Sequence, residues 1–97
     1  MNYYFDWDVN KAQTNFKKHK ITFEKATEIF YDPLALSLYD DLHSEDEDRW
    51  ITLGVTKSGT IIVVIHTYKE LNSNDVKIRI ISARKATKNE IKQYQGE

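Results

Sequence analysis

The chain has 97 residues, of which 40% are hydrophobic and 30% charged, and its formal net charge is −1. This composition is typical of a single globular domain spanning residues 1–97, and it excludes a disordered or collagen-like chain. The lack of cysteine excludes disulfides and thiolate chemistry, and the near-neutral total excludes nucleic-acid binding through bulk charge alone.

The N-terminal residues predict a strand followed by a helix. Residues 3–7 are mostly aromatic and predict an edge strand. Asp8 is a good N-cap for a helix that runs to about residue 18. Val9, Ala12 and Phe16 recur at helical spacing, so we expect them to share one face of this helix.

A second helix is predicted directly afterwards. Thr22 is its expected N-cap, and Asp32-Pro33 ends it, because the residue before proline is disfavoured in the α region. Four apolar residues share one face of the helix and predict a buried stripe: Phe23, Ala26, Ile29 and Phe30.

The middle of the chain predicts three strands. Residues 34–39 and 50–56 alternate in the period of two that is typical of strands, and the acidic segment 40–48 between them is expected to be a loop. Residues 57–60 predict a hairpin turn. Residues 61–68 are nearly all β-branched or aromatic, which predicts a central strand covered on both faces.

The C-terminal part predicts one more strand and a short helix. Residues 69–75 form a polar loop, and residues 76 to about 83 alternate as the last strand. Thr87 and Glu90 have the spacing of a capping box and open a terminal helix. The predicted fold is therefore α+β: a small antiparallel sheet with two N-terminal helices and a short C-terminal helix.

Charge is distributed unevenly along this chain. Residues 40–48 carry six carboxylates, whereas residues 77–92 carry six cations. A second basic group lies in the N-terminal helices: Lys11, Lys17, Lys18, Lys20 and Lys25. Such a chain can present one cationic face to an anionic partner despite its neutral total, although a solvated surface fits the same pattern.

Two segments contain candidate chemistry. Lys18 and His19 end the first helix, where they either complement the helix dipole or supply a phosphate contact and a group that titrates near neutral pH. In the acidic loop, Glu45 or Glu47 is expected to pair with Arg49 and orient its guanidinium. The spacing His43-x-Glu45-x-Glu47 is too loose for a metal site, so no metal and no cofactor are expected.

The last strand and the terminal helix add three candidates. Arg79 and Arg84 frame the strand, and two guanidinium groups near one strand end would form a cradle for phosphate. Tyr94 is expected to be a core residue that could offer its hydroxyl to a substrate. His66, inside the most apolar run, is expected to be a buried histidine with satisfied hydrogen bonds.

In these residues the chain closely resembles the BrnT family of type II toxins over nearly its full length. The matching pieces occur in a fixed order, and their ordered set is specific. They are Phe5-Asp6-Trp7-Asp8 with Asn10-Lys11, residues 15–19, residues 21–26 leading to Phe30, residues 32–35, His43-Ser44 with Glu47 and Arg49-Trp50, Gly54, residues 63–67, residues 78–87, Glu90 and Tyr94.

The resemblance implies a RelE-like fold and an endoribonuclease that cleaves RNA, free or on the ribosome, and arrests translation. It also implies a cognate BrnA-like antitoxin with a ribbon-helix-helix DNA-binding portion. The toxin–antitoxin complex is expected to repress its own promoter, so DNA is contacted only through the complex. Because this chain is slightly acidic, RNA binding must depend on local cations.

Metal-independent transesterification is the mechanism consistent with these residues. Such a site must remove one proton, supply another and stabilise a phosphorane. We assign these tasks to seven catalytic candidates: Lys18, His19, His43, Glu47, Arg49, Arg79 and Arg84. Three further residues are substrate-binding candidates: Lys17, Lys85 and Tyr94.

Two other functions compete with this interpretation. A non-enzymatic protein-interaction module would use the exposed edge at residues 3–7 and the many aromatic residues. A DNA-binding repressor subunit is disfavoured, because no helix-turn-helix pattern is present. No apolar run approaches the length of a membrane span and residues 1–6 do not resemble a signal peptide, so we expect a cytoplasmic protein with no membrane partner.

Overall fold

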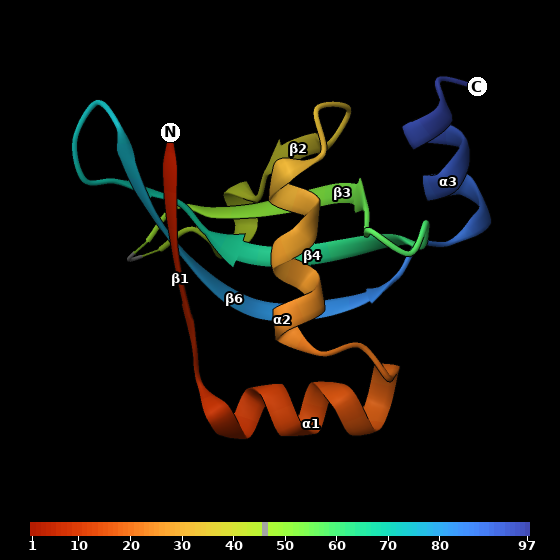
Figure 1. Ribbon diagram of the computed structural model, residues 1–97, viewed down its shortest axis with the longest axis horizontal. Helices are drawn as coiled ribbons and strands as arrows, with labels where there is room; N and C mark the ends of the chain where they lie inside the picture. The colour runs from red at the N-terminus through yellow and green to blue at the C-terminus, as the bar shows by residue number, and fades with distance from the viewer. Residues whose placement is uncertain (46) are drawn as a thin grey trace.

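A six-stranded sheet is the centre of the fold (Figure 1). The computed structural model describes residues 1–45 and 47–97. The strands are β1 (Asn2–Trp7), β2 (Leu36–Tyr39), β3 (Arg49–Val55), β4 (Ile61–Thr67), β5 (Lys69–Glu70) and β6 (Asp75–Lys85). Their order across the sheet is β1-β6-β4-β3-β2, and the short β5 also pairs with β6.

Strand β1 pairs in parallel with β6, from Asn2 opposite Asp75 to Trp7 opposite Ile80, whereas the other pairs are antiparallel. The α+β class and the mostly antiparallel sheet are confirmed, and β4 is the central strand as predicted. The parallel edge was not predicted. It arises because the two N-terminal helices and the β-meander separate β1 from its partner, as a parallel connection requires.

The helices begin at the predicted caps. They are α1 (Val9–His19), α2 (Phe23–Ala26) and α3 (Lys88–Gln95), with 3-10 helices η1 (Thr27–Tyr31) and η2 (Asp41–His43). Oδ1 of Asp8 accepts from the N–H of Asn10 at 2.8 Å. Thr22 accepts from the Lys25 N–H, and Thr87 and Glu90 form the expected capping box. The η2 turn lies within the segment that we expected to be entirely loop.

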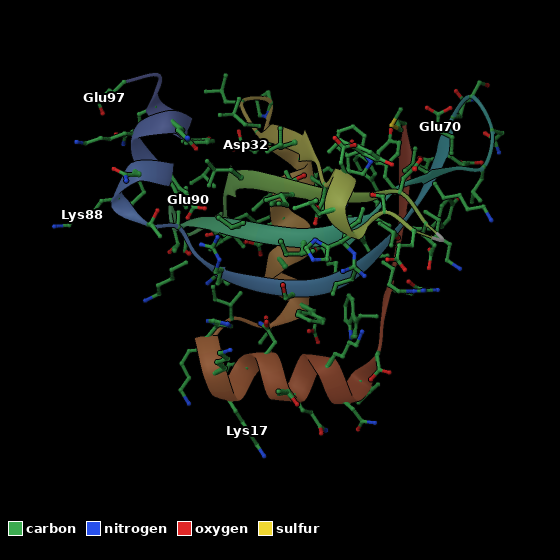
Figure 2. All side chains as sticks on the ribbon, turned by 180° about the vertical axis from the view of Figure 1, so that it is seen from behind. Lys17, Asp32, Glu70, Lys88, Glu90 and Glu97 are labelled. Carbon is green, nitrogen blue, oxygen red and sulfur yellow. The ribbon has the colours of Figure 1, made fainter. Side chains whose placement is uncertain are left out.

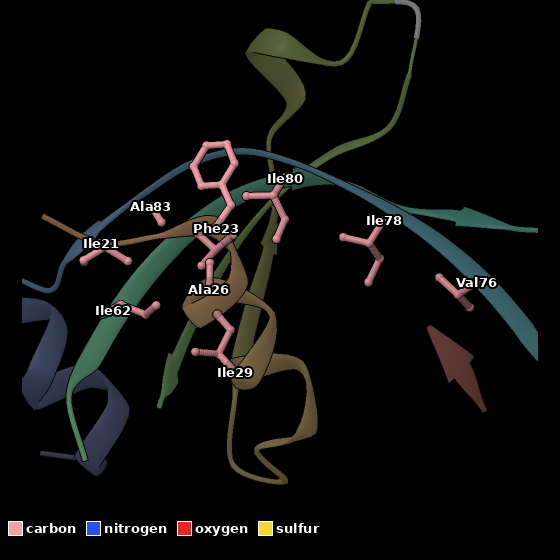
Figure 3. Close-up of a cluster of buried hydrophobic side chains, with 10 residues drawn as sticks. Ile21, Phe23, Ala26, Ile29, Ile62, Val76, Ile78, Ile80 and Ala83 are labelled. Atoms are coloured by element: carbon pink, nitrogen blue, oxygen red, sulfur yellow. The ribbon is translucent and has the colours of Figure 1, made fainter. Parts of the chain in front are cut away.

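The core lies between one face of the sheet and the α2–η1 segment, which runs across that face (Figures 1 and 3). Phe23, Ala26 and Ile29 of the predicted stripe are fully buried, and Phe30 is half-buried. The sheet contributes the other principal core side chains: Ile62, Val64, Val76, Ile78, Ile80 and Ala83. Gly54 allows the close approach of η1, because a Cβ there would lie 2.9 Å from Cβ of Ile29.

Helix α1 lies beside β6 and not across the sheet (Figure 1). Val9, Ala12 and Phe16 line one hollow and so share a face of α1, as predicted. That face is only partly covered, because Val9 is 65% and Phe16 46% exposed. The buried residue of α1 is Asn15. Its side chain hydrogen-bonds the backbone of Ala83, which lies beyond the end of the β1 pairing.

Helix α3 is fixed to the end of the sheet through Asp32. The Tyr94 hydroxyl donates to Oδ2 of Asp32 at 2.5 Å, and the Val55 N–H donates to the same oxygen at 2.9 Å. The hydrogen bond to Asp32, together with burial, raises the pKa of Tyr94 to about 12. Burial acts to raise the pKa of Asp32, but the hydrogen bonds from Tyr94, Val55 and Leu34 outweigh it and lower the pKa.

Figure 2 shows the second face of the sheet, with α1, α2 and α3 lying behind the sheet or beside it. Strand register places its residues in rows. One row contains Leu36, Leu53, Val63 and Arg84, and the next contains Leu38, Ile51, Ile65 and Ser82. A third row begins where Arg49 lies opposite Thr67. We call this surface the open face.

Candidate active site

The loop between β2 and β3 is closed at its base by a set of hydrogen bonds. The Asp40 N–H donates to the Arg49 carbonyl at 2.8 Å. Oγ of Ser44 donates to the Asp40 carbonyl at 2.7 Å and accepts from the Arg49 N–H at 2.9 Å. Tyr39 adds a bond from its hydroxyl to Asp48. These contacts hold the two ends of the loop in one geometry; Asp46 lies outside the described residues.

A pocket of about 340 Å³ lies between this loop, the third row of the open face and the start of α1. We call it the loop pocket. It brings together four of the predicted catalytic residues: His43, Glu47, Arg49 and Arg79. The other residues that line it are Lys11, Glu45, Thr67 and Ile81.

His43 is held by a carboxylate. Its Nδ1 lies 2.9 Å from Oδ2 and 3.1 Å from Oδ1 of Asp40. The Asp40 side chain is 13% exposed, whereas that of His43 is 63% exposed. A carboxylate on Nδ1 favours the tautomer that carries its proton there, which leaves Nε2 as the basic nitrogen at the pocket.

Glu47 pairs with Arg79 and not with Arg49. Nη1 of Arg79 lies 3.0 Å from Oε1 of Glu47, and its Nε lies 3.6 Å from Oδ1 of Asp6. Asp6 also approaches Lys77 at 3.5 Å. This corrects the predicted partner of the acidic loop: Arg49 lies at the base of the loop, so the guanidinium that Glu47 reaches is the one on β6. Two carboxylates therefore hold Arg79 at the pocket.

A buried hydrogen-bond chain lies beneath Thr67. Nδ1 of His66 donates to the Thr67 carbonyl at 2.9 Å, and its Nε2 lies 2.6 Å from Oγ1 of Thr52, which contacts Oγ of Ser37 at 2.8 Å. Burial lowers the pKa of His66 to about 4, opposed in part by its bond to Thr67. His66 is thus the buried, satisfied histidine that was predicted. Oγ1 of Thr67 accepts from the Arg79 N–H at 3.1 Å.

Lys18 and His19 line a second pocket of about 330 Å³, the helix pocket, between α1 and β6. Lys11 and Ile81 line both pockets, so the two are adjacent. Lys17 lies outside both, because it projects from α1 away from the sheet (Figure 2).

The remaining candidates lie further along β6 and on α3. Arg84 is five residues beyond Arg79, roughly 16 Å along an extended strand, so the two do not form one cradle. Arg84 pairs in two-point fashion with Glu90, at 2.8 and 3.0 Å, and this hydrogen bonding lowers the pKa of Glu90 to about 2. Lys85 ends β6, and Tyr94 holds Asp32.

Three residues of the site were not among the sequence candidates. Asp40 lies three positions before His43, a spacing at which one helical turn brings two side chains together. Lys11 belongs to a basic group and to the family resemblance, but no role was assigned to it. Thr67 ends a segment of the resemblance, residues 63–67, but a threonine at a strand end is ordinary and was given no role.

Within residues 1–45 and 47–97, no three histidine, aspartate or glutamate side chains are close enough together to hold a metal ion. None of the helices in the same residues combines the length and apolar character that a membrane crossing requires.

Residues 7–90 match the family model described as "Ribonuclease toxin, BrnT, of type II toxin-antitoxin system". Among solved structures, the ribonuclease toxin BrnT of Brucella abortus superimposes with a TM-score of 0.62 at 24% identity, covering 91% of this chain and all of that one. No curated protein sequence matches the chain. The chain belongs to the BrnT family: it is an endoribonuclease toxin of a type II system, and it has a cognate antitoxin.

Proposed function

We propose that the chain cleaves RNA at the loop pocket by metal-independent transesterification. The ribose 2′-hydroxyl attacks the adjacent phosphorus and loses its proton, and the 5′-oxygen leaves and gains one. The products are a 2′,3′-cyclic phosphate and a 5′-hydroxyl. One observation carries the proposal: a carboxylate-held imidazole and two guanidinium groups line one pocket.

His43 is the proton carrier in this proposal, and Asp40 is its positioning residue. The Asp40 carboxylate stabilises the imidazolium that forms when Nε2 takes the 2′-hydroxyl proton. A general base of this kind contributes roughly 10²–10⁴-fold to a rate. The high exposure of the His43 side chain leaves room for an RNA chain to reach it.

Arg49, Arg79 and Lys11 are the charges that we assign to the phosphorane. Guanidinium groups match phosphate oxygens in two-point contacts, and fixed charges stabilise the transition state without reorganising. Glu47 orients Arg79 through their 3.0 Å contact. In this assignment Glu47 is a positioning residue and His43 is the base.

Lys18 and His19 would contact RNA on one side of the cleavage point, because the helix pocket adjoins the loop pocket through Lys11. Lys17 and Lys85 would add outer phosphate contacts. Arg84 and Tyr94 support the site through the fold: their contacts with Glu90 and Asp32 are already made within the chain.

We also propose that the cognate antitoxin is a ribbon-helix-helix protein and that its complex with this chain represses its own promoter. The resemblance to the BrnT family supports both statements. An RNA substrate, free or on ribosomes, supports a cytoplasmic site of action.

RNA cleavage by the purified chain in EDTA tests this function. We expect the wild type to cut, Arg49→Ala to lose cutting, and Lys57→Ala, which removes an exposed cation at the β3–β4 turn, to cut normally. Circular dichroism checks that each variant is folded. Cutting by Arg49→Ala at the wild-type rate would refute the site, and a requirement for added divalent metal would refute the mechanism.

A further inference from the structure

The open face contains an apolar surface that the proposed chemistry does not use. Leu36 is 47% and Leu38 68% exposed on the edge strand β2. They line a cavity of about 550 Å³ with Ile51, Leu53, Val63 and Ile65. We call these six residues the apolar rows. Leu53 and Val63 are buried, at 7% and 1% exposed, and Ile51 and Ile65 are partly exposed, so the most exposed part of the rows is Leu36 and Leu38. Exposed apolar patches rimmed by polar residues mark interaction sites.

The dimensions of the apolar rows suit one α-helix. The rows span β2, β3 and β4, which is two strand spacings, or about 10 Å, close to the diameter of a helix with its side chains. At the far side of the cavity stand Arg84 and Glu90, paired to each other, and Gln93 of α3. These polar groups form a rim around an aliphatic floor, as in protein interfaces.

The apolar rows adjoin the loop pocket. Leu38 lies two residues before Asp40, and Ile51 and Ile65 lie two residues from Arg49 and Thr67 on the same face of the sheet. Two residues along a strand are roughly 7 Å. A helix on the apolar rows would therefore reach the cations Arg49 and Arg79 with its end.

We propose that the apolar rows are the docking surface for an amphipathic helix of the cognate antitoxin, which covers the loop pocket with its end. The helix presents an apolar stripe to Leu36, Leu38, Ile51 and Ile65. Carboxylates at its end pair with Arg49 and Arg79, the charges assigned to the RNA phosphate. Inhibition then follows from occlusion; this last step rests on the proposed function, whereas docking rests only on the type II family.

The test is the affinity of the purified full-length cognate antitoxin for toxin variants, measured by calorimetry. Leu38→Lys is expected to weaken binding by at least about 30-fold, the effect of removing an interface hot spot. Leu71→Lys is the matched control, because Leu71 is 50% exposed on the β5–β6 loop, away from the open face. It is expected to bind as the wild type does.

Three results would overturn the proposal. The first is that Leu38→Lys is folded by circular dichroism and binds the antitoxin with wild-type affinity. The second is that Leu71→Lys weakens binding as much as Leu38→Lys does. In the third, sedimentation shows that the free toxin is a dimer that Leu38→Lys dissociates without a change in antitoxin affinity, which would assign the surface to a second copy. RNA cleavage by the free variants is measured separately, so failure of the proposed chemistry would leave the binding result readable.

Discussion

Asn15 on α1 and Ala83 on β6 bond to each other in both directions. Nδ2 of Asn15 donates to the Ala83 carbonyl at 2.9 Å, and its Oδ1 accepts from the Ala83 N–H at 3.0 Å. Nδ2 also donates to the Ile21 carbonyl at 3.1 Å. One side chain thereby takes the place of a neighbouring strand for β6 where β1 has ended, and it fixes the turn between α1 and α2.

Replacing Asn15 with alanine should be among the most destabilising single changes in α1. The N–H and carbonyl of Ala83 would be left buried without partners, at about 1–3 kcal/mol each, so we expect a loss of roughly 2–6 kcal/mol. Urea unfolding measures it, with Gln13→Ala on an exposed turn of α1 as the control. Equal midpoints for the two variants would contradict the role of Asn15.

His43→Ala should slow RNA cleavage by roughly 10²–10⁴-fold, the usual contribution of a general base. Asp40→Asn should also slow it, because the imidazolium that forms during the reaction loses its counter-charge. The double variant should be no slower than His43→Ala alone, since Asp40 acts only through His43. Single-turnover rates check this, with Asp41→Asn as the control; additive losses would exclude the pair as a unit.

Arg84→Ala should lower stability without removing cleavage. The change leaves Glu90 without its two-point partner and loosens α3, which the ion pair holds to β6. We expect a lower thermal midpoint, with the cleavage rate per folded molecule unchanged at low temperature. Loss of cleavage in a variant that is fully folded would instead return Arg84 to the catalytic group.

Lys69→Gln should weaken RNA binding without lowering stability. Lys69 and Lys77 lie directly opposite each other on β5 and β6, an arrangement of like charges that normally costs 0.2–1 kcal/mol. Both line a small hollow with Glu47, Thr67 and Arg79, next to the loop pocket. If Lys69 contacts one phosphate, its removal reduces the salt slope of RNA binding by about 0.7. A lower melting temperature with an unchanged salt slope would contradict this; Lys57→Gln is the control.

The stability of the protein should fall as the pH drops from 6.5 to about 4. His66 is neutral when buried, with a pKa of about 4, whereas in the unfolded chain it titrates near 6.5. The unfolded state therefore binds more protons in this window, and the contribution, about 3 kcal/mol, is present above pH 6.5 and lost by pH 4. Urea titrations at several pH values measure it. In His66→Gln the slope across this window should shrink, and an unchanged slope would assign it to other groups.

Local signals were sufficient for most of the fold. Asp8, Thr22 and Thr87 each begin a helix as their side chains predict, because capping depends on neighbouring backbone groups alone. The position of α1 could not be predicted in this way. The spacing of Val9 and Phe16 predicts a shared face but not what that face packs on, and the packing is decided by Asn15 and a strand 68 residues away.

The sequence predicted several residues of the site, but not which of them pair with one another. His43, Glu47, Arg49 and Arg79 are chemically distinctive, and the structure places them around one pocket. Which carboxylate holds which cation depends on how a loop crosses the sheet. The sequence neighbour Arg49 therefore looked like the partner of Glu47, while the actual contact, to Arg79, spans 32 positions.

The pairing of β1 with β6 also determines the order in which the molecule can assemble. Asn2 meets Asp75, 73 positions later, and the helices of the N-terminal half pack on Val76, Ile78 and Ile80. A chain still being synthesised has no partner for its first strand, and only part of its core, until β6 has left the ribosome. Closing so long a loop is slow. The loop pocket, which Arg79 and Ile81 of β6 line, therefore cannot form until most of the chain has been made.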